Sequence, residues 1–139
     1  MNYKFTPCTD EEAEFIDDSL VEFNLSKVPP TQEDFISFNT KVTDDDGNVI
    51  AGCLAGMYFW NVVYIDILWV DERYRKKGLG SALLKEVERK AKEEGGYIVH
   101  LDTFDWQAKE FYEKNGYTVF GTLENCPKDH NRYYMTKTI

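Results

Sequence analysis

The sequence has few of the residues that build disulfide frameworks or zinc sites. Its 139 residues include only three cysteines and two histidines. Cys8, Cys53 and Cys126 are odd in number and widely spaced, without the short spacing of metal ligands. His100 and His130 also stand far apart in the chain. We therefore expect reduced thiols in a cytoplasmic protein that binds no metal ion.

Long apolar runs and a surplus of positive charge are also missing. No apolar stretch approaches the roughly 20 residues that cross a bilayer. The first residues, Met-Asn-Tyr-Lys-Phe, lack the apolar core of a signal peptide. Against 25 Asp and Glu residues there are 16 Lys and Arg, which gives a net charge of −9. This acidity argues against general affinity for nucleic acid or for anionic membranes.

The composition is that of a folded globule. Hydrophobic residues make up 42% of the chain and aromatic residues 15%, which is unlike a disordered segment. The length suits one domain, and the sequence contains no repeat, low-complexity tract or linker. We expect a single domain over residues 1–139.

Hydrophobic periodicity and turn residues predict an α+β arrangement. A helix is expected after a cap at Thr9 or Asp10, and it should end before Lys-Val-Pro-Pro at residues 27–30. A second, amphipathic helix is expected at 79–94, with Glu86/Lys90 and Glu88/Lys92 as i,i+4 pairs, and a short helix at 106–115. Strands are expected at 3–6, 34–44, 49–60, 62–70, 97–101, 117–122 and 131–138.

The loop at residues 75–81, Arg-Lys-Lys-Gly-Leu-Gly-Ser, is the most informative segment. It joins the strand at 62–70 to the start of the long helix, where first-turn N–H groups have no helical partner. Gly78 and Gly80 remove two Cβ atoms there, so an anion can approach the main chain. Cationic side chains flank this turn: Arg73, Arg75, Lys76 and Lys77. We call the N–H groups of residues 76–81 the phosphate cradle.

Other interpretations of these glycines are possible. A dinucleotide-binding turn needs a small residue where Leu83 stands, and a P-loop needs a Gly-Lys-Ser/Thr that is absent. A solvated basic loop without a ligand remains an alternative on these residues alone.

Two segments resemble the GNAT superfamily of acyl-CoA-dependent N-acetyltransferases. Residues 70–84, Val-Asp-Glu-Arg-Tyr-Arg-Lys-Lys-Gly-Leu-Gly-Ser-Ala-Leu-Leu, resemble its motif A. Residues 108–117, Ala-Lys-Glu-Phe-Tyr-Glu-Lys-Asn-Gly-Tyr, resemble its motif B, and the two occur in the family's order. The resemblance implies a mixed, mostly antiparallel sheet of about seven strands flanked by about four helices. It also implies acetyl-CoA as co-substrate and a possible homodimer.

The resemblance places the cofactor on particular residues. It implies that the coenzyme A pyrophosphate rests on the loop, and that the pantetheine arm follows the main chain of the preceding strand. That strand should diverge from the strand at 97–101 to form a slot. The implied cofactor-binding residues are Leu68, Trp69, Val70, Arg75, Lys76, Lys77, Gly78, Leu79, Gly80 and Ser81.

Two residues are the candidates for catalysis. The family's general acid, which protonates the departing thiolate, matches Tyr112, although a half-buried packing tyrosine is the alternative. Asp66 is our first candidate for the base, because a carboxylate inside a strand is costly to bury. Asp102, Asp105 and Glu22 are weaker candidates, and a water chain is equally plausible. Asp105 is also a natural N-cap for a helix at 106.

The acceptor is the open question. We expect acetyl transfer to a primary amine of a small molecule, which the acidic body would attract. The alternatives are acetylation of a protein lysine or N-terminus, and a non-catalytic acyl-CoA-binding domain. Trp60 could line the acceptor pocket.

Overall fold

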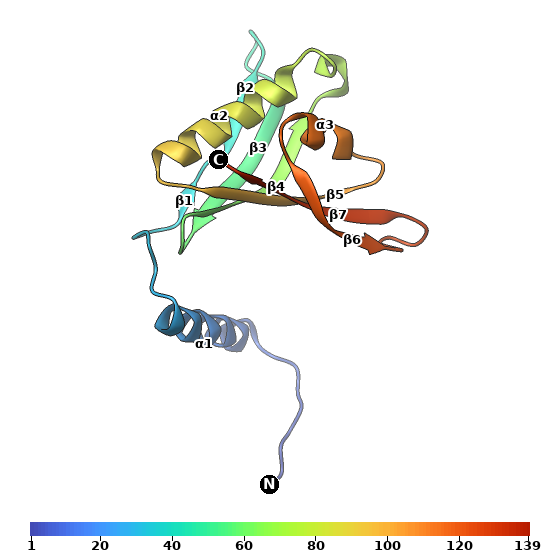
Figure 1. Cartoon of the computed structure of the whole chain (residues 1–139). Helices are drawn as coiled ribbons and strands as arrows, with labels where there is room; N and C mark the ends of the chain where they lie inside the picture. The colour runs from blue at the N-terminus through green and yellow to red at the C-terminus, as the bar shows by residue number, and fades with distance from the viewer. The chain divides into compact units, whose positions relative to one another are not determined.

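A capped helix forms the first of two compact units. The computed structural model describes residues 1–139, which divide into units at 1–31 and 32–139 (Figure 1). In the first, α1 (Asp10–Lys27) begins with a capping box: Thr9 Oγ1 accepts from the Glu12 N–H, and Glu12 Oε1 accepts from the Thr9 N–H. The strand expected at residues 3–6 is wrong, because these residues pair with no other strand.

The second unit is built on a seven-stranded sheet, as predicted. The spatial order is β1-β3-β4-β5-β7-β6, with β2 also paired to β3, and all pairs except β4–β5 are antiparallel. The strands are β1 (Ile36–Ser37), β2 (Thr40–Thr43), β3 (Val49–Tyr58), β4 (Val62–Val70), β5 (Ile98–Phe104), β6 (Thr118–Glu124) and β7 (Asn131–Thr138). The helices are η1 (Glu72–Tyr74), α2 (Leu79–Glu93) and α3 (Lys109–Lys114). The mixed, mostly antiparallel α+β class is therefore confirmed, with three α-helices and one 3-10 turn.

The strand predicted at 34–44 is interrupted. Its two pieces, β1 and β2, both pair with β3. Between them, the Asn39 side-chain oxygen accepts a hydrogen bond from the Ala55 N–H at 3.0 Å. This oxygen replaces the backbone carbonyl that would accept the bond in a continuous strand pair. A side chain that bonds to the backbone in this way competes with continuous pairing.

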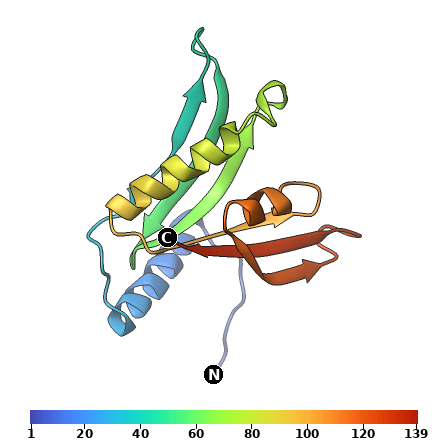
Figure 2. The same ribbon diagram turned by 45° about the horizontal axis from the view of Figure 1, so that its top comes forward.

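The core lies between α2 and one face of the sheet, which we call the α2 face (Figure 2). Leu84 and Val87 of α2 are buried together with Met57 and Val63 of the sheet, so the predicted apolar helix face is confirmed. Each such side chain stabilises the fold by about 1.5–3 kcal/mol through removal of apolar surface from water.

Only one of the two predicted helix ion pairs forms. Glu86 lies 3.8 Å from Lys90, as expected. Glu88 does not pair with Lys92, because its carboxylate turns toward the sheet, where it accepts from Lys137 at 2.7 Å and from the Tyr117 hydroxyl at 2.8 Å. Local spacing cannot reveal a partner 49 residues away.

Candidate active site

The parallel strands β4 and β5 separate partway along their length. They pair only from Val62 to Tyr64, opposite Ile98 to His100. Beyond this point β4 has an extra residue: Leu54 of β3 faces Ile67 and Ala55 faces Ile65, so Asp66 forms a β-bulge. A bulge bends its strand and increases the local twist. The predicted divergence of these two strands is confirmed.

A cleft of about 130 Å³ occupies the gap between the separated strands. It is lined by Ile65, Asp66, Ile67, Leu68, Leu101, Asp102, Thr103, Gln107 and Tyr112. Leu101 and Thr103 are buried toward the α2 face, whereas Asp102 alternates with them along β5 and points to the opposite face. Side chains from both faces of the sheet therefore line the cleft.

Tyr112 presents its hydroxyl to this cleft. Its ring packs against Phe111 and Tyr117, and the residue as a whole is only 6% exposed, so it is buried rather than half-buried. The hydroxyl has no hydrogen-bond partner within the protein, yet no buried polar side-chain atom lacks one, so this oxygen reaches the cleft surface. Burial raises the pKa of Tyr112 above its ordinary value, which keeps the phenol protonated at neutral pH.

The phosphate cradle lies at an uncapped helix N-terminus. Gly78 is the N-cap of α2 with φ 79°, and no side chain accepts a hydrogen bond from the first-turn N–H groups. The N–H groups of Leu79, Gly80 and Ser81 therefore lack an intrahelical acceptor. This differs from α1, whose first turn is closed by its own Thr9. An uncapped turn of this kind is a ready site for an anion.

The two glycines of the loop have different roles. A Cβ at Gly78 would meet open space, so this position needs glycine for its positive φ. A Cβ at Gly80 would lie 3.3 Å from the Phe111 ring and 3.6 Å from Val70 Cγ2. The expectation that Gly80 clears space for a ligand is wrong: its missing side chain lets α2 pack against α3 and the end of β4.

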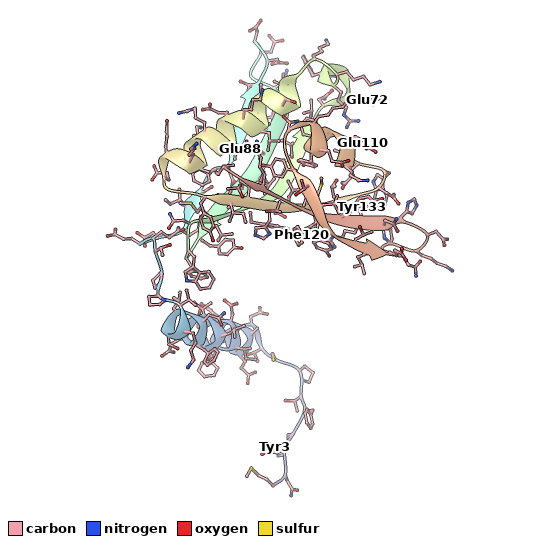
Figure 3. All side chains as sticks on the ribbon, viewed as in Figure 1. Tyr3, Glu72, Glu88, Glu110, Phe120 and Tyr133 are labelled. Carbon is pink, nitrogen blue, oxygen red and sulfur yellow. The ribbon has the colours of Figure 1, made fainter.

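The cationic side chains beside the cradle are only partly free. Arg73 pairs with Asp71 at 3.1 Å, and this contact lowers the pKa of that carboxyl. Arg75 donates from Nε to the Val70 carbonyl at 2.9 Å, which fixes the loop on β4. Lys76 and Lys77 are exposed and form no ion pair, so they can meet a bound phosphate. Figure 3 labels Glu72 of η1, which precedes this loop, and Glu110 of α3.

The other predicted cofactor residues lie in the cleft or next to the loop at 75–81. Leu68 lines the cleft, and Val70 packs beside Gly80. Trp69 points to the face opposite α2, so only its main chain lies along the free edge of β4. Ser81 Oγ accepts from the Asn115 amide at 3.2 Å, which links α2 to the end of α3. Their contacts with a cofactor remain predictions.

The carboxylate candidates differ in position. Asp66 is exposed on the bulge, so the argument from costly burial does not apply, but it does line the cleft. Asp105 does not cap a helix, because α3 begins at Lys109 with Ala108 as its N-cap. Its carboxylate instead accepts from the Asn131 N–H and from His130 Nδ1, which together lower its pKa. Glu22 belongs to α1 in the other unit.

Sequence reasoning missed the two partners of Asp102. Arg132 of β7 donates to Asp102 Oδ1 from Nε at 2.9 Å and from Nη2 at 2.6 Å. Tyr64 of β4 donates to Asp102 Oδ2 at 3.2 Å. These residues lie 30 and 38 positions from Asp102, and only the strand register brings them together.

A larger open hollow lies elsewhere on this unit. It measures about 270 Å³ and is lined by Lys85, Glu88, Arg89, Lys92, Lys137 and Ile139. Within this hollow, Glu88 already pairs with Lys137 of β7 at 2.7 Å. None of the residues that line it belongs to the cradle or to the cleft. We therefore assign the chemistry to the smaller cleft.

The chain is similar to known proteins in both sequence and fold. Residues 8–117 match the Acetyltransferase (GNAT) family model. The chain is 35% identical over 91 residues to a blasticidin-S acetyltransferase of Streptomyces morookaense, which covers 65% of this chain and 67% of that protein. A Bacillus cereus acetyltransferase solved at 1.9 Å has a TM-score of 0.93 at 35% identity over 99% of this chain and 98% of its own. An aminoglycoside 6′-N-acetyltransferase solved with coenzyme A has a TM-score of 0.65 at 20% identity, over 94% and 81% of the two chains.

The chain belongs to the GNAT acetyltransferase family. It is an acyltransferase that depends on acetyl-CoA. None of its helices has both the length and the apolar character that a membrane span requires.

Proposed function

We infer that this protein transfers the acetyl group of acetyl-CoA to a primary amine of a small molecule, by direct attack in a ternary complex. The observation that carries the proposal is the unbonded Tyr112 hydroxyl in a cleft between separated strands, beside an uncapped helix N-terminus. Binding, polarisation and proton donation each have a group of the required kind, on α2, β4 and α3 respectively.

Each group has a physical role in the proposal. The first-turn N–H groups of α2 hold the pyrophosphate by charge-assisted hydrogen bonds, with Lys76 and Lys77 nearby. The β4 edge beyond Tyr64 has no strand partner on the β5 side, so a main-chain N–H near Leu68 or Trp69 can polarise the thioester carbonyl. Tyr112 then donates a proton to the departing thiolate of coenzyme A.

The acceptor amine must lose a proton before it attacks. An alkyl amine with a pKa near 10.4 is neutral in only about one part in 2,500 at pH 7. Asp66 and Asp102 give the cleft two carboxylates, which suit a group that arrives as an ammonium ion. A cleft of about 130 Å³ with walls from both strands also suits an amine at the end of a narrow chain. The similarity to a blasticidin-S acetyltransferase favours a small-molecule acceptor.

A thiol-release assay tests this function directly. Acetyl-CoA is mixed with the protein and, separately, blasticidin S, kanamycin, spermidine and a lysine-containing peptide. We expect amine-dependent release of coenzyme A with at least one of the three small amines. Turnover of the peptide alone would favour a protein acceptor, and acetyl-CoA binding without any turnover would contradict an enzymatic role.

Asp66 remains our proposed base, and Asp66→Asn tests it. Loss of the base is expected to lower kcat/KM by about a hundredfold, since general-base catalysis contributes roughly 10²–10⁴. A kcat/KM of Asp66→Asn equal to that of the wild-type protein would exclude Asp66 and leave a water chain.

A further inference from the structure

Asp102 is the one cleft carboxylate that the protein holds in a fixed position. Its side chain is 17% exposed, and Arg132 and Tyr64 bind it from two neighbouring strands. The Arg132 guanidinium is itself fixed, because it lies 5.2 Å from the Phe104 ring centroid and 5.6 Å from that of Tyr134. Asp66, on the other wall, has no such support and is exposed on its bulge.

The hydrogen bonds to Asp102 leave one acceptor position open. A carboxylate has about four lone-pair sites, two on each oxygen. Oδ1 accepts twice from Arg132, whereas Oδ2 accepts once, from the Tyr64 hydroxyl. Because Asp102 lines the cleft, its remaining site on Oδ2 is available to a donor inside the cleft.

We propose that Asp102 determines specificity by binding the acceptor as an alkylammonium ion, and that Arg132 and Tyr64 are its positioning residues. This inference rests on the proposed function and names the charge state of the group that the site recognises. Tyr112 lies on the α2 face and Asp102 on the opposite face, so the thioester and the ammonium reach the cleft from different sides of the sheet.

The chain offers a matched control for a substitution at Asp102. Asp105 directly follows β5. Like Asp102, it has a partner that can carry a positive charge, His130, and it accepts a second hydrogen bond, from the Asn131 N–H. Unlike Asp102, it does not line the cleft. Asp102→Asn and Asp105→Asn each remove one charge while keeping the side chain's size, so they differ mainly in position relative to the cleft.

The experiment uses the full chain and the small amine of the panel above that the wild-type protein acetylates best. For each variant we would measure the KM for this amine, the Kd for acetyl-CoA and the Tm. Asp102→Asn is expected to raise the amine KM about tenfold, equivalent to about 1.4 kcal/mol, with the Kd for acetyl-CoA unchanged. Asp105→Asn should change neither constant, and Asp102→Glu should recover part of the loss.

The possible results separate this inference from the function on which it rests. If Asp102 only stabilises the pairing of β5 with β7, Asp102→Asn will lower the Tm while the amine KM stays at the wild-type value. The inference is then wrong. If Asp105→Asn raises the amine KM as much as Asp102→Asn, general surface charge explains the effect and the inference is also wrong. If the wild-type protein acetylates none of the amines, the proposed function itself fails and the inference fails with it.

Discussion

Replacing Tyr112 by Phe is expected to lower kcat by about tenfold or more, because the departing thiolate loses its proton donor. The Kd for acetyl-CoA should remain unchanged, since the Tyr112 hydroxyl bonds to no other group that shapes the site. Steady-state kinetics and a separate binding titration distinguish the two effects. Burial also raises the pKa of this phenol, so wild-type activity should not fall through its ionisation as pH rises toward 10.

Tyr117→Phe is the matched control for this variant. Tyr117 is a second buried tyrosine whose ring contacts Tyr112, but its hydroxyl donates to Glu88 at 2.8 Å. Its removal should lower the free energy of unfolding by about 1–3 kcal/mol, because Glu88 loses a hydrogen bond. The kcat should not change. If Tyr112→Phe keeps the wild-type kcat, or if both variants lose kcat equally, Tyr112 is not the proton donor.

A negative charge in the cradle is expected to weaken cofactor binding beyond any effect of backbone strain. Gly78→Asp places a carboxylate at the first turn of α2, in a position where a Cβ meets nothing within 4 Å. Two unit charges about 5 Å apart repel by roughly 3 kcal/mol at an effective dielectric constant of about 20. The affinity for acetyl-CoA should therefore fall by about tenfold or more relative to Gly78→Asn.

Gly78→Asn separates charge from backbone strain. Asn and Asp have the same size, and both tolerate the positive φ of 79° at this position better than most residues. The Asp variant should be at least as stable as the Asn variant, because a carboxylate at a helix N-terminus is favourable by about 0.3–1 kcal/mol. Thermal unfolding and calorimetric titration measure the two opposite effects. Equal acetyl-CoA affinity of the two variants would mean that no anion binds at this turn.

Features that depend on neighbouring residues were predictable from the sequence. The Gly-Leu-Gly-Ser turn, its lysines and the apolar face of α2 lie within 20 residues of one another, so composition and spacing were sufficient. The same is true of α1, whose cap at Thr9 is a local signal. The strand at 131–138 was also predicted with its observed bounds.

Features that depend on the pairing of distant strands were not predictable. The bulge at Asp66 exists because β3 and β4 differ by one residue in register, and no local pattern marks this difference. Gly80 was assigned to ligand access, but its contact is with Phe111 from another helix. The hydrogen bonds from Arg132 and Tyr64 to Asp102 likewise require that β5 lie beside β7 and near β4.

A crystal structure of this chain with coenzyme A tests the central claim most directly. The account predicts that the pyrophosphate oxygens lie within hydrogen-bond distance of the Leu79, Gly80 and Ser81 N–H groups, with the pantetheine arm along the free edge of β4. The sulfur should then lie beside the Tyr112 hydroxyl. A pyrophosphate bound elsewhere, with the first turn of α2 unoccupied, would contradict it.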